Sequence, residues 1–194
     1  MKARHIPNAI TLSRLCLAPP LLIALYLIEA KTAMIAVFVF FALTDWIDGA
    51  LARGVRGWSS AFGQRIDPYA DKALCWPALL GLILELPTNV MILVPIAVFL
   101  FYDGMGETLR LLKLTTAPNW YAKKKTLVQM VALLILWCGI VLPSLQLFGI
   151  TFVTLGLSLL WISTGLACIA GYAYLKESGV IDWILRRMPI FPSL

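Results

Sequence analysis

The sequence predicts an all-α integral membrane protein with six transmembrane helices. Three observations predict this fold class: the composition, the spacing of the apolar stretches and the distribution of positive charge. Of the 194 residues, 61% are hydrophobic and only 13% are charged, and the mean hydropathy is +0.88. Soluble domains carry about 25% charged residues, so a water-soluble globule is excluded.

Apolar stretches long enough to cross a bilayer, which takes about 20 residues, follow one another along the chain. They cover residues 9–29, 32–52, 61–86, 90–112, 126–147 and 150–175. They leave no room for a separate soluble domain, so we expect a single membrane domain over residues 1–194. The segment Lys2 to Ile28 begins like a signal peptide, but Arg14 interrupts its apolar run and further spans follow. We therefore interpret it as the first membrane helix.

Positive charge predicts the orientation of these spans. With both termini in the cytoplasm, every lysine and arginine except Lys31 lies on or near the inner side. This asymmetry follows the positive-inside rule, and an even number of spans returns both ends to one face. The net charge of +6 is then explained by topology and by attraction to anionic lipids, so we expect no nucleic-acid partner. A bacterial inner membrane, with the functional face toward the cytoplasm, is the expected location.

The two ends of the chain are less hydrophobic than the spans. Met1 to Pro7 is basic, and Glu177 to Leu194 carries Arg186 and Arg187 among aromatic and aliphatic residues. Basic and apolar residues together are typical of segments that lie in the membrane interface. We expect an N-terminal and a C-terminal interfacial segment along the inner leaflet.

Most of the acidic residues lie inside the apolar stretches, where charged side chains are unfavourable. Ionisable groups inside spans are costly and indicate function by default. Six of the ten acidic residues fall in the cytoplasmic halves of three spans: Asp45, Asp48, Asp67, Asp71, Asp103 and Glu107. The first two are three residues apart and the next two are four apart, so each pair shares one helix face. An antiparallel helix pair brings these four aspartates to one level near the inner surface.

Four neighbouring carboxylates need cations to offset their repulsion, and Mg²⁺ or Mn²⁺ suits an all-oxygen cluster. Gly49, Ala52 and Gly63 are small enough to admit a flat group or a second backbone, and Arg53 adds positive charge for a phosphate. These features together predict a nucleotide or diphosphate site. Taken singly, each acid could instead be neutralised by a salt bridge, and each glycine could serve helix packing.

The stretch from Asp45 to Asp71, DWIDGALARGVRGWSSAFGQRIDPYAD, resembles the signature of the CDP-alcohol phosphatidyltransferase family. That signature reads D-x-x-D-G-x-x-A-R, then a gap of eight or nine residues, then G-x-x-x-D-x-x-x-D. The gap here is nine residues, a spacing associated with cardiolipin synthases of the same fold. IPNAITLSR, ending at Arg14, and KKKTLVQMVAL, beginning at Lys123, resemble further stretches of the family.

The resemblance implies a six-helix homodimeric enzyme that moves a phosphatidyl group from CDP-diacylglycerol to an alcohol and releases CMP. Asp45, Asp48, Asp67 and Asp71 would hold two Mg²⁺ or Mn²⁺ ions on the diphosphate. Asp71 would also be the base that takes the proton of the acceptor hydroxyl. Gly49 and Ala52 would accommodate the cytidine, with Gly63 at the helix crossing, and Arg53 would support the phosphates. Asn8, Thr11 and Arg14 could contact the donor phosphates, although Asn8 could equally be an N-cap.

The acceptor pocket is expected on the inner side of the fourth and fifth spans. Arg110 and Lys125 could hold the phosphate of glycerol 3-phosphate there. Arg110 could instead be paired with Glu107 or Asp103, and Lys125 could be a positive-inside anchor. The fourth span reads YDGMGETLR, with Tyr102 and Asp103 where relatives that use glycerol 3-phosphate commonly have an Arg-Glu pair.

The first hypothesis is therefore an enzyme that uses glycerol 3-phosphate, a small phosphorylated alcohol. A cardiolipin synthase that uses a lipid alcohol, phosphatidylglycerol, is the alternative, and inositol phosphate or serine also remains possible as an acceptor. An ion-coupled transporter is the alternative of a different class. It would need polar residues through to the far side of the membrane, and the outer halves of the spans offer only scattered Ser and Thr.

Overall fold

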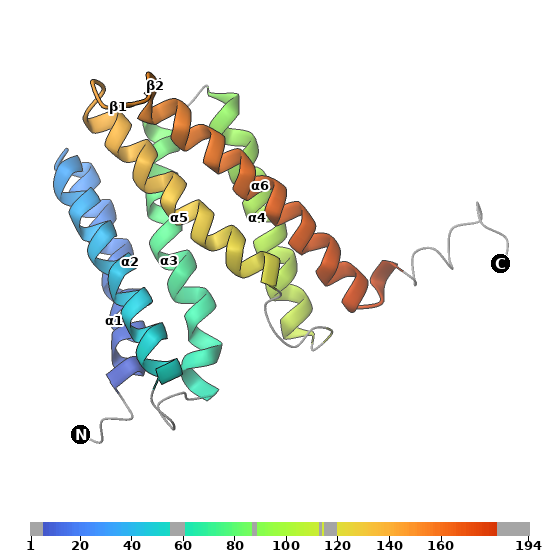
Figure 1. Ribbon diagram of the computed structural model, residues 1–194. Helices are drawn as coiled ribbons and strands as arrows, with labels where there is room; N and C mark the ends of the chain where they lie inside the picture. Colours follow the sequence, from blue (N-terminus) through green and yellow to red (C-terminus); the bar gives the residue numbers. More distant parts are fainter. Residues whose placement is uncertain (1–5, 55–60, 87–88, 113, 115–119, 182–194) are drawn as a thin grey trace, which may run out of the picture.

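The computed structural model describes residues 6–54, 61–86, 89–112, 114 and 120–181, and side chains for residues 11–44, 66, 69–86, 89–112, 114 and 120–181. Six long helices account for most of the described chain (Figure 1). They are α1 (Ile6–Leu27), α2 (Lys31–Gly54), α3 (Ala61–Glu85), α4 (Val90–Leu111), α5 (Trp120–Val141) and α6 (Phe152–Glu177). The predicted all-α class is confirmed.

The helices run alternately up and down. The start of α1 and the end of α6 lie toward one end of the bundle, and the α1–α2 turn lies at the other (Figure 1). Among the described residues, α4, α5 and α6 are long and apolar enough to cross a membrane, and α1 and α2 contribute shorter apolar helices over 11–27 and 31–44. The chain is thus a helical membrane protein. That all six helices cross the membrane stays a prediction.

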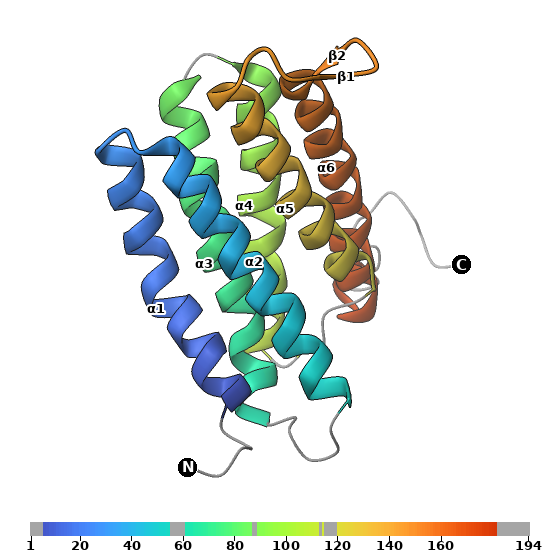
Figure 2. The same cartoon turned by 60° about the vertical axis from the view of Figure 1, so that its left-hand side comes forward.

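The bundle has two halves of three helices each. In one half, α1 packs along both α2 and α3; in the other, α6 packs along both α4 and α5 (Figure 2). The halves meet mainly where α5 contacts α2 and α3, whereas α3 and α4 touch each other sparsely. At the junction of α3 and α5, the Trp137 indole nitrogen donates to the Ala78 carbonyl at 3.1 Å, and its ring lies against Gly81. This junction joins the halves through apolar packing and a buried hydrogen bond.

Glycines let α5 and α6 approach closely. A Cβ atom added to Gly139 on α5 would lie 2.7 Å from the backbone nitrogen of Val153. A Cβ added to Gly156 on α6 would lie 2.9 Å from the backbone nitrogen of Leu136. Helices in lipid associate by such close packing of small residues, because lipid tails are as apolar as the side chains themselves.

The expected boundaries of the fifth span were wrong. The predicted stretch was 126–147, but α5 begins six residues earlier and ends at Val141, before a hairpin of β1 (Gln146–Leu147) and β2 (Ile150–Thr151). Hydropathy excluded Lys123 to Lys125, although lysine is a good helix former. Pro143 cannot continue a helix, so the chain turns soon after α5. Of the interfacial segments, residues 1–5 and 182–194 lie outside the described residues.

Replacing Gly139 with alanine tests the close α5–α6 packing. The added methyl meets backbone, which cannot yield as a side chain can, so we expect Gly139→Ala to cost about 1–3 kcal/mol. The measurement is the thermal unfolding midpoint in detergent. Gly165→Ala is the matched control because nothing lies within 4 Å of its added Cβ. Equal midpoints for the two variants would contradict the packing described.

Candidate active site

The two acidic pairs lie at similar heights on α2 and α3. Asp45 and Asp48 lie nine and six residues before the last residue of α2, and Asp67 and Asp71 lie six and ten residues after the first residue of α3. At 1.5 Å per residue, all four are about 9–15 Å from those helix ends. The two ends lie near each other at the end of the bundle where the chain begins (Figure 1). The backbone therefore allows the predicted cluster.

Several predicted residues can be placed only by their helix. The side chains of Asp45, Asp48 and Asp67 lie outside the described residues, as do those of the remaining predicted donor contacts: Asn8, Gly49, Ala52, Arg53 and Gly63. Among the side chains that are described, no three His, Cys, Asp or Glu residues gather into a metal-binding group. The four-aspartate cluster stays a prediction.

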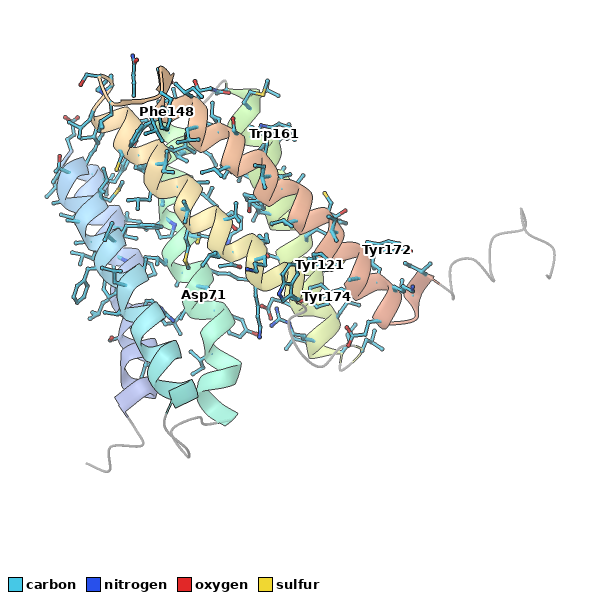
Figure 3. All side chains as sticks on the ribbon, in the orientation of Figure 1. Asp71, Tyr121, Phe148, Trp161, Tyr172 and Tyr174 are labelled. Atoms are coloured by element: carbon cyan, nitrogen blue, oxygen red, sulfur yellow. The ribbon has the colours of Figure 1, made fainter. Side chains whose placement is uncertain are left out.

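Asp71 faces α1 and a buried arginine. The Arg14 Nη2 atom lies 3.8 Å from Asp71 Oδ1, and only 1% of the Arg14 side chain is exposed. Thr11, one helical turn earlier on α1, is also buried. Burying a guanidinium is costly without a counter-charge, so the nearby carboxylate stabilises Arg14 inside the bundle. Asp71 itself keeps 30% of its side chain exposed, in the half of α3 nearest the chain's start (Figure 3).

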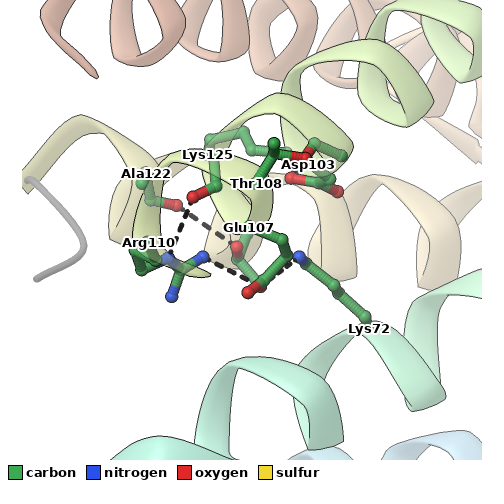
Figure 4. A network of polar contacts seen from close by, with 10 residues as sticks. Lys72, Asp103, Glu107, Thr108, Arg110, Ala122 and Lys125 are labelled. Atoms are coloured by element: carbon green, nitrogen blue, oxygen red, sulfur yellow. Dashed lines mark hydrogen bonds and ion pairs between the residues drawn. The ribbon is translucent and has the colours of Figure 1, made fainter. Parts of the chain in front are cut away.

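A second group of charges joins α3 to α4 (Figure 4). One carboxylate oxygen of Glu107, Oε1, accepts hydrogen bonds from Lys72 Nζ at 2.6 Å and from Arg110 Nη2 at 2.9 Å. Arg110 also donates through Nε to the Gly106 carbonyl at 3.3 Å. Glu107 and Arg110 are three residues apart on α4, the spacing at which helical side chains meet. Lys72 comes from α3 and directly follows Asp71 in the sequence.

Lys125 extends this group to α5. Its Nζ atom donates to Asp103 Oδ1 at 2.7 Å and lies 5.0 Å from the centroid of the Phe99 ring. Only 6% of the Lys125 side chain is exposed, unlike those of its exposed neighbours Lys123 and Lys124. The alternative interpretation of Lys125 as a positive-inside anchor stays a prediction, but its side chain is paired inside the bundle. The buried ammonium is stabilised by a carboxylate and an aromatic face.

The structure resolves the alternatives for the pairing of Arg110. Glu107 is its partner, as one alternative suggested, while Asp103 pairs with Lys125 instead. The contact between Lys72 and Glu107 was not predicted. The two residues are 35 positions apart, and only residues three or four apart on one helix are expected to meet from spacing alone. The sequence offered only a weaker signal: two different spans each carry a charge in the half predicted to be cytoplasmic, and each charge needs a partner. Together Lys72, Arg110 and Lys125 exceed their two carboxylate partners by one positive charge.

Comparison with known proteins decides the family. The sequence pattern of the CDP-alcohol phosphatidyltransferase family matches residues 4–171. The chain belongs to this family. It is 37% identical over 183 residues to a CDP-diacylglycerol--glycerol-3-phosphate 3-phosphatidyltransferase of Pseudomonas fluorescens, covering 90% of each chain. A protein of the same name from Rickettsia bellii is 32% identical over 175 residues, which are 89% of this chain and 94% of that one.

This family membership agrees with the resemblance seen in the sequence. The matched region includes the whole stretch from Asp45 to Asp71, as well as Arg14, the Glu107 group and Lys125. A further relative of the same name, from Salmonella choleraesuis, is 37% identical over 144 residues, or 69% of this chain and 77% of its own. The charged groups described above therefore lie within a phosphatidyltransferase domain.

A double-mutant cycle tests the pairing of Arg14 with Asp71. Arg14→Met leaves the carboxylate without this counter-charge, and Asp71→Leu leaves a fully buried guanidinium without it. We expect each change to lower the unfolding free energy, with a loss for the double variant that is about 1–3 kcal/mol smaller than the two single losses together. The measurement is denaturant unfolding in detergent. Losses that simply add would show that the two side chains do not stabilise each other.

Proposed function

We propose that the protein transfers a phosphatidyl group from CDP-diacylglycerol to glycerol 3-phosphate, giving phosphatidylglycerophosphate and CMP. The relatives named for this reaction, from three bacterial genera, support the proposal. One observation in the structure carries it: consecutive residues of α3 join the two groups of charges. Asp71 pairs with Arg14 on α1, and Lys72 pairs with Glu107 beside Arg110 on α4. The residue assigned as the base is thus next in sequence to a member of the cationic group.

Asp71 acts as the base in this proposal. Its carboxylate accepts the proton of the acceptor hydroxyl as that oxygen bonds to the phosphorus of the phosphatidyl group. The bond between this phosphorus and the CMP oxygen breaks, and CMP leaves with the electron pair. The partial exposure of Asp71 leaves it open to an acceptor, and Arg14 holds it from the α1 side.

Asp45, Asp48, Asp67 and Asp71 would hold two divalent cations. A set of carboxylates, without His or Cys among these four residues, fits Mg²⁺ or Mn²⁺ better than zinc. When bound, such ions neutralise a diphosphate and polarise its phosphorus. The matching heights of the two pairs on α2 and α3 support this assignment.

The remaining donor contacts are assigned to the same end of α1, α2 and α3. Gly49 and Ala52 would leave room for the cytidine, with Gly63 across from them, and Arg53 would bind the phosphates. Asn8, Thr11 and Arg14 belong to the corresponding end of α1. Thr11 and Arg14 are both buried, which fits contact within the bundle rather than with lipid.

Arg110 is the better candidate for the acceptor phosphate. Its side chain is one-fifth exposed and presents a guanidinium that can grip two phosphate oxygens, whereas Lys125 is buried against Asp103. The excess positive charge of the group favours a phosphorylated acceptor. Phosphatidylglycerol is the second candidate acceptor, because the nine-residue gap from Gly54 to Phe62 favours cardiolipin synthesis.

The proposal extends to the surroundings of the enzyme. Six crossings would place both termini and the active site on the cytoplasmic side, as the positive-inside asymmetry favours. The bacterial relatives support a bacterial inner membrane. We also propose a homodimer, as the family resemblance implies.

Product identification is the direct test of the function. Purified protein is supplied with CDP-diacylglycerol, Mg²⁺ or Mn²⁺, and each acceptor in turn, and the lipid product is identified by chromatography. We expect phosphatidylglycerophosphate with glycerol 3-phosphate. Product with phosphatidylglycerol alone would support the second candidate. Movement of divalent metal into liposomes without CMP release would contradict the enzyme and support a transporter.

Asp71→Asn tests the base. The amide keeps the size of the side chain and an oxygen that can accept from Arg14, but it does not accept a proton from a hydroxyl, so we expect CMP release to fall at least about 1000-fold. Glu29→Gln, the same chemical change at an exposed carboxylate in the α1–α2 turn, is the control. Size-exclusion chromatography measures the folded protein of both variants. Activity retained by folded Asp71→Asn would remove Asp71 from this role.

A further inference from the structure

Asp71 and Lys72 link α3 to both of its charged neighbours. Consecutive residues point about 100° apart around a helix. Accordingly, Asp71 meets Arg14 on α1, while Lys72 reaches Glu107 on α4. The first contact lies within one half of the bundle and the second crosses between the halves. Lys72 and Glu107 therefore tie the half that carries the base to the half that carries Arg110.

At this level the contacts of α3 with α4 centre on Glu107, which also hydrogen-bonds the Tyr69 side chain of α3. The two helices touch sparsely, and the apolar contacts between the halves run mainly through α5. The Lys72–Glu107–Arg110 bridge, in contrast, is short and mostly shielded from water: the three side chains are 23%, 17% and 20% exposed. Shielding from solvent strengthens such ion pairs over surface ones. The spacing of α3 and α4 here depends on the contacts that Glu107 makes with α3, chief among them the charged bridge to Lys72.

Glu107 also keeps two like charges near each other. Because Lys72 Nζ and Arg110 Nη2 bind the same oxygen, at 2.6 and 2.9 Å, the two nitrogens are at most about 5.5 Å apart. Without the carboxylate they would repel each other, and the long side chains would separate. The negative charge of Glu107 therefore fixes where Arg110 lies relative to Lys72, and so relative to Asp71.

We propose that Glu107 is a positioning residue for the acceptor. It holds Arg110 at a set distance from Asp71, so that an acceptor whose phosphate binds Arg110 presents its hydroxyl to the base. Glu107 acts through Lys72 and Arg110 and does not touch the reacting atoms. This inference rests on the proposed function, since it takes Arg110 as the acceptor-phosphate ligand and Asp71 as the base.

Glu107→Gln tests the proposal through the kinetic constants of each substrate. We expect the KM for glycerol 3-phosphate to rise at least fivefold and kcat to fall, while the KM for CDP-diacylglycerol changes less than twofold. Glu107→Asp keeps the charge on a shorter side chain and should recover part of the loss. Lys72→Met breaks the same bridge from α3 and should show the same pattern.

Glu85→Gln is the matched control. Glu85 is also a partly buried carboxylate that pairs with a lysine across two helices, Lys31 on α2, but at the opposite end of α3. We expect both of its KM values to stay within twofold of wild type. A merely structural role for Glu107 would instead lower activity with both KM values unchanged, and a general distortion would raise both.

Either of those patterns in Glu107→Gln would overturn the proposal, as would an unchanged KM for the acceptor. If Glu107→Gln does not yield folded protein, Lys72→Met gives the same comparison. Failure of the proposed function is seen separately, in wild type: no product from glycerol 3-phosphate contradicts that function. In that case, the effect of Glu107→Gln is measured on the KM of the acceptor that the wild-type protein does use.

Discussion

The pairing of buried and partly buried charges organises the half of this bundle in which α1 begins. Charged side chains are expensive inside an apolar helix bundle unless a counter-charge lies close. Here two successive residues of α3 meet that requirement in different directions: Asp71 with Arg14 on α1, and Lys72 with Glu107 on α4. These pairings fix the position of α3 between the two halves. They also leave a partly exposed carboxylate beside a group of cations.

At the opposite end of the bundle, close helix packing holds the helices together. Apolar and small-residue packing dominates there, with Gly139 and Gly156 bringing α5 and α6 together and Trp137 joining α5 to α3. The Lys31–Glu85 ion pair also lies at that end, so both ends contain paired charges, and apolar packing is added to them there. The phosphatidyl transfer that we propose joins a lipid substrate to a charged alcohol. Family membership gives the chemistry, and the charged groups indicate where it takes place.

Much of the fold could be predicted from hydropathy, because a bilayer requires long apolar helices and the chain has room for little else. The ends of α5 were predicted at the wrong residues. Hydropathy detects apolar stretches, so it left out the helical lysines at the start of α5 and gave no sign of the hairpin after Pro143. The pair Glu107–Arg110 follows from local spacing. The contacts Arg14–Asp71 and Lys72–Glu107 do not, because they depend on which helices pack together. Asp45 and Asp48 of α2 were found as carboxylates within an apolar stretch, and their ligand role is still a prediction.

In the proposed active site, carboxylates of α2 and α3 share divalent cations. Electron paramagnetic resonance of Mn²⁺ added to the purified wild-type protein tests it directly, because free and bound Mn²⁺ give different spectra. We expect about two bound ions per chain at millimolar Mn²⁺, and fewer in Asp45→Asn, where α2 loses a ligand. No bound Mn²⁺ in wild type, or the same number in Asp45→Asn, would contradict it.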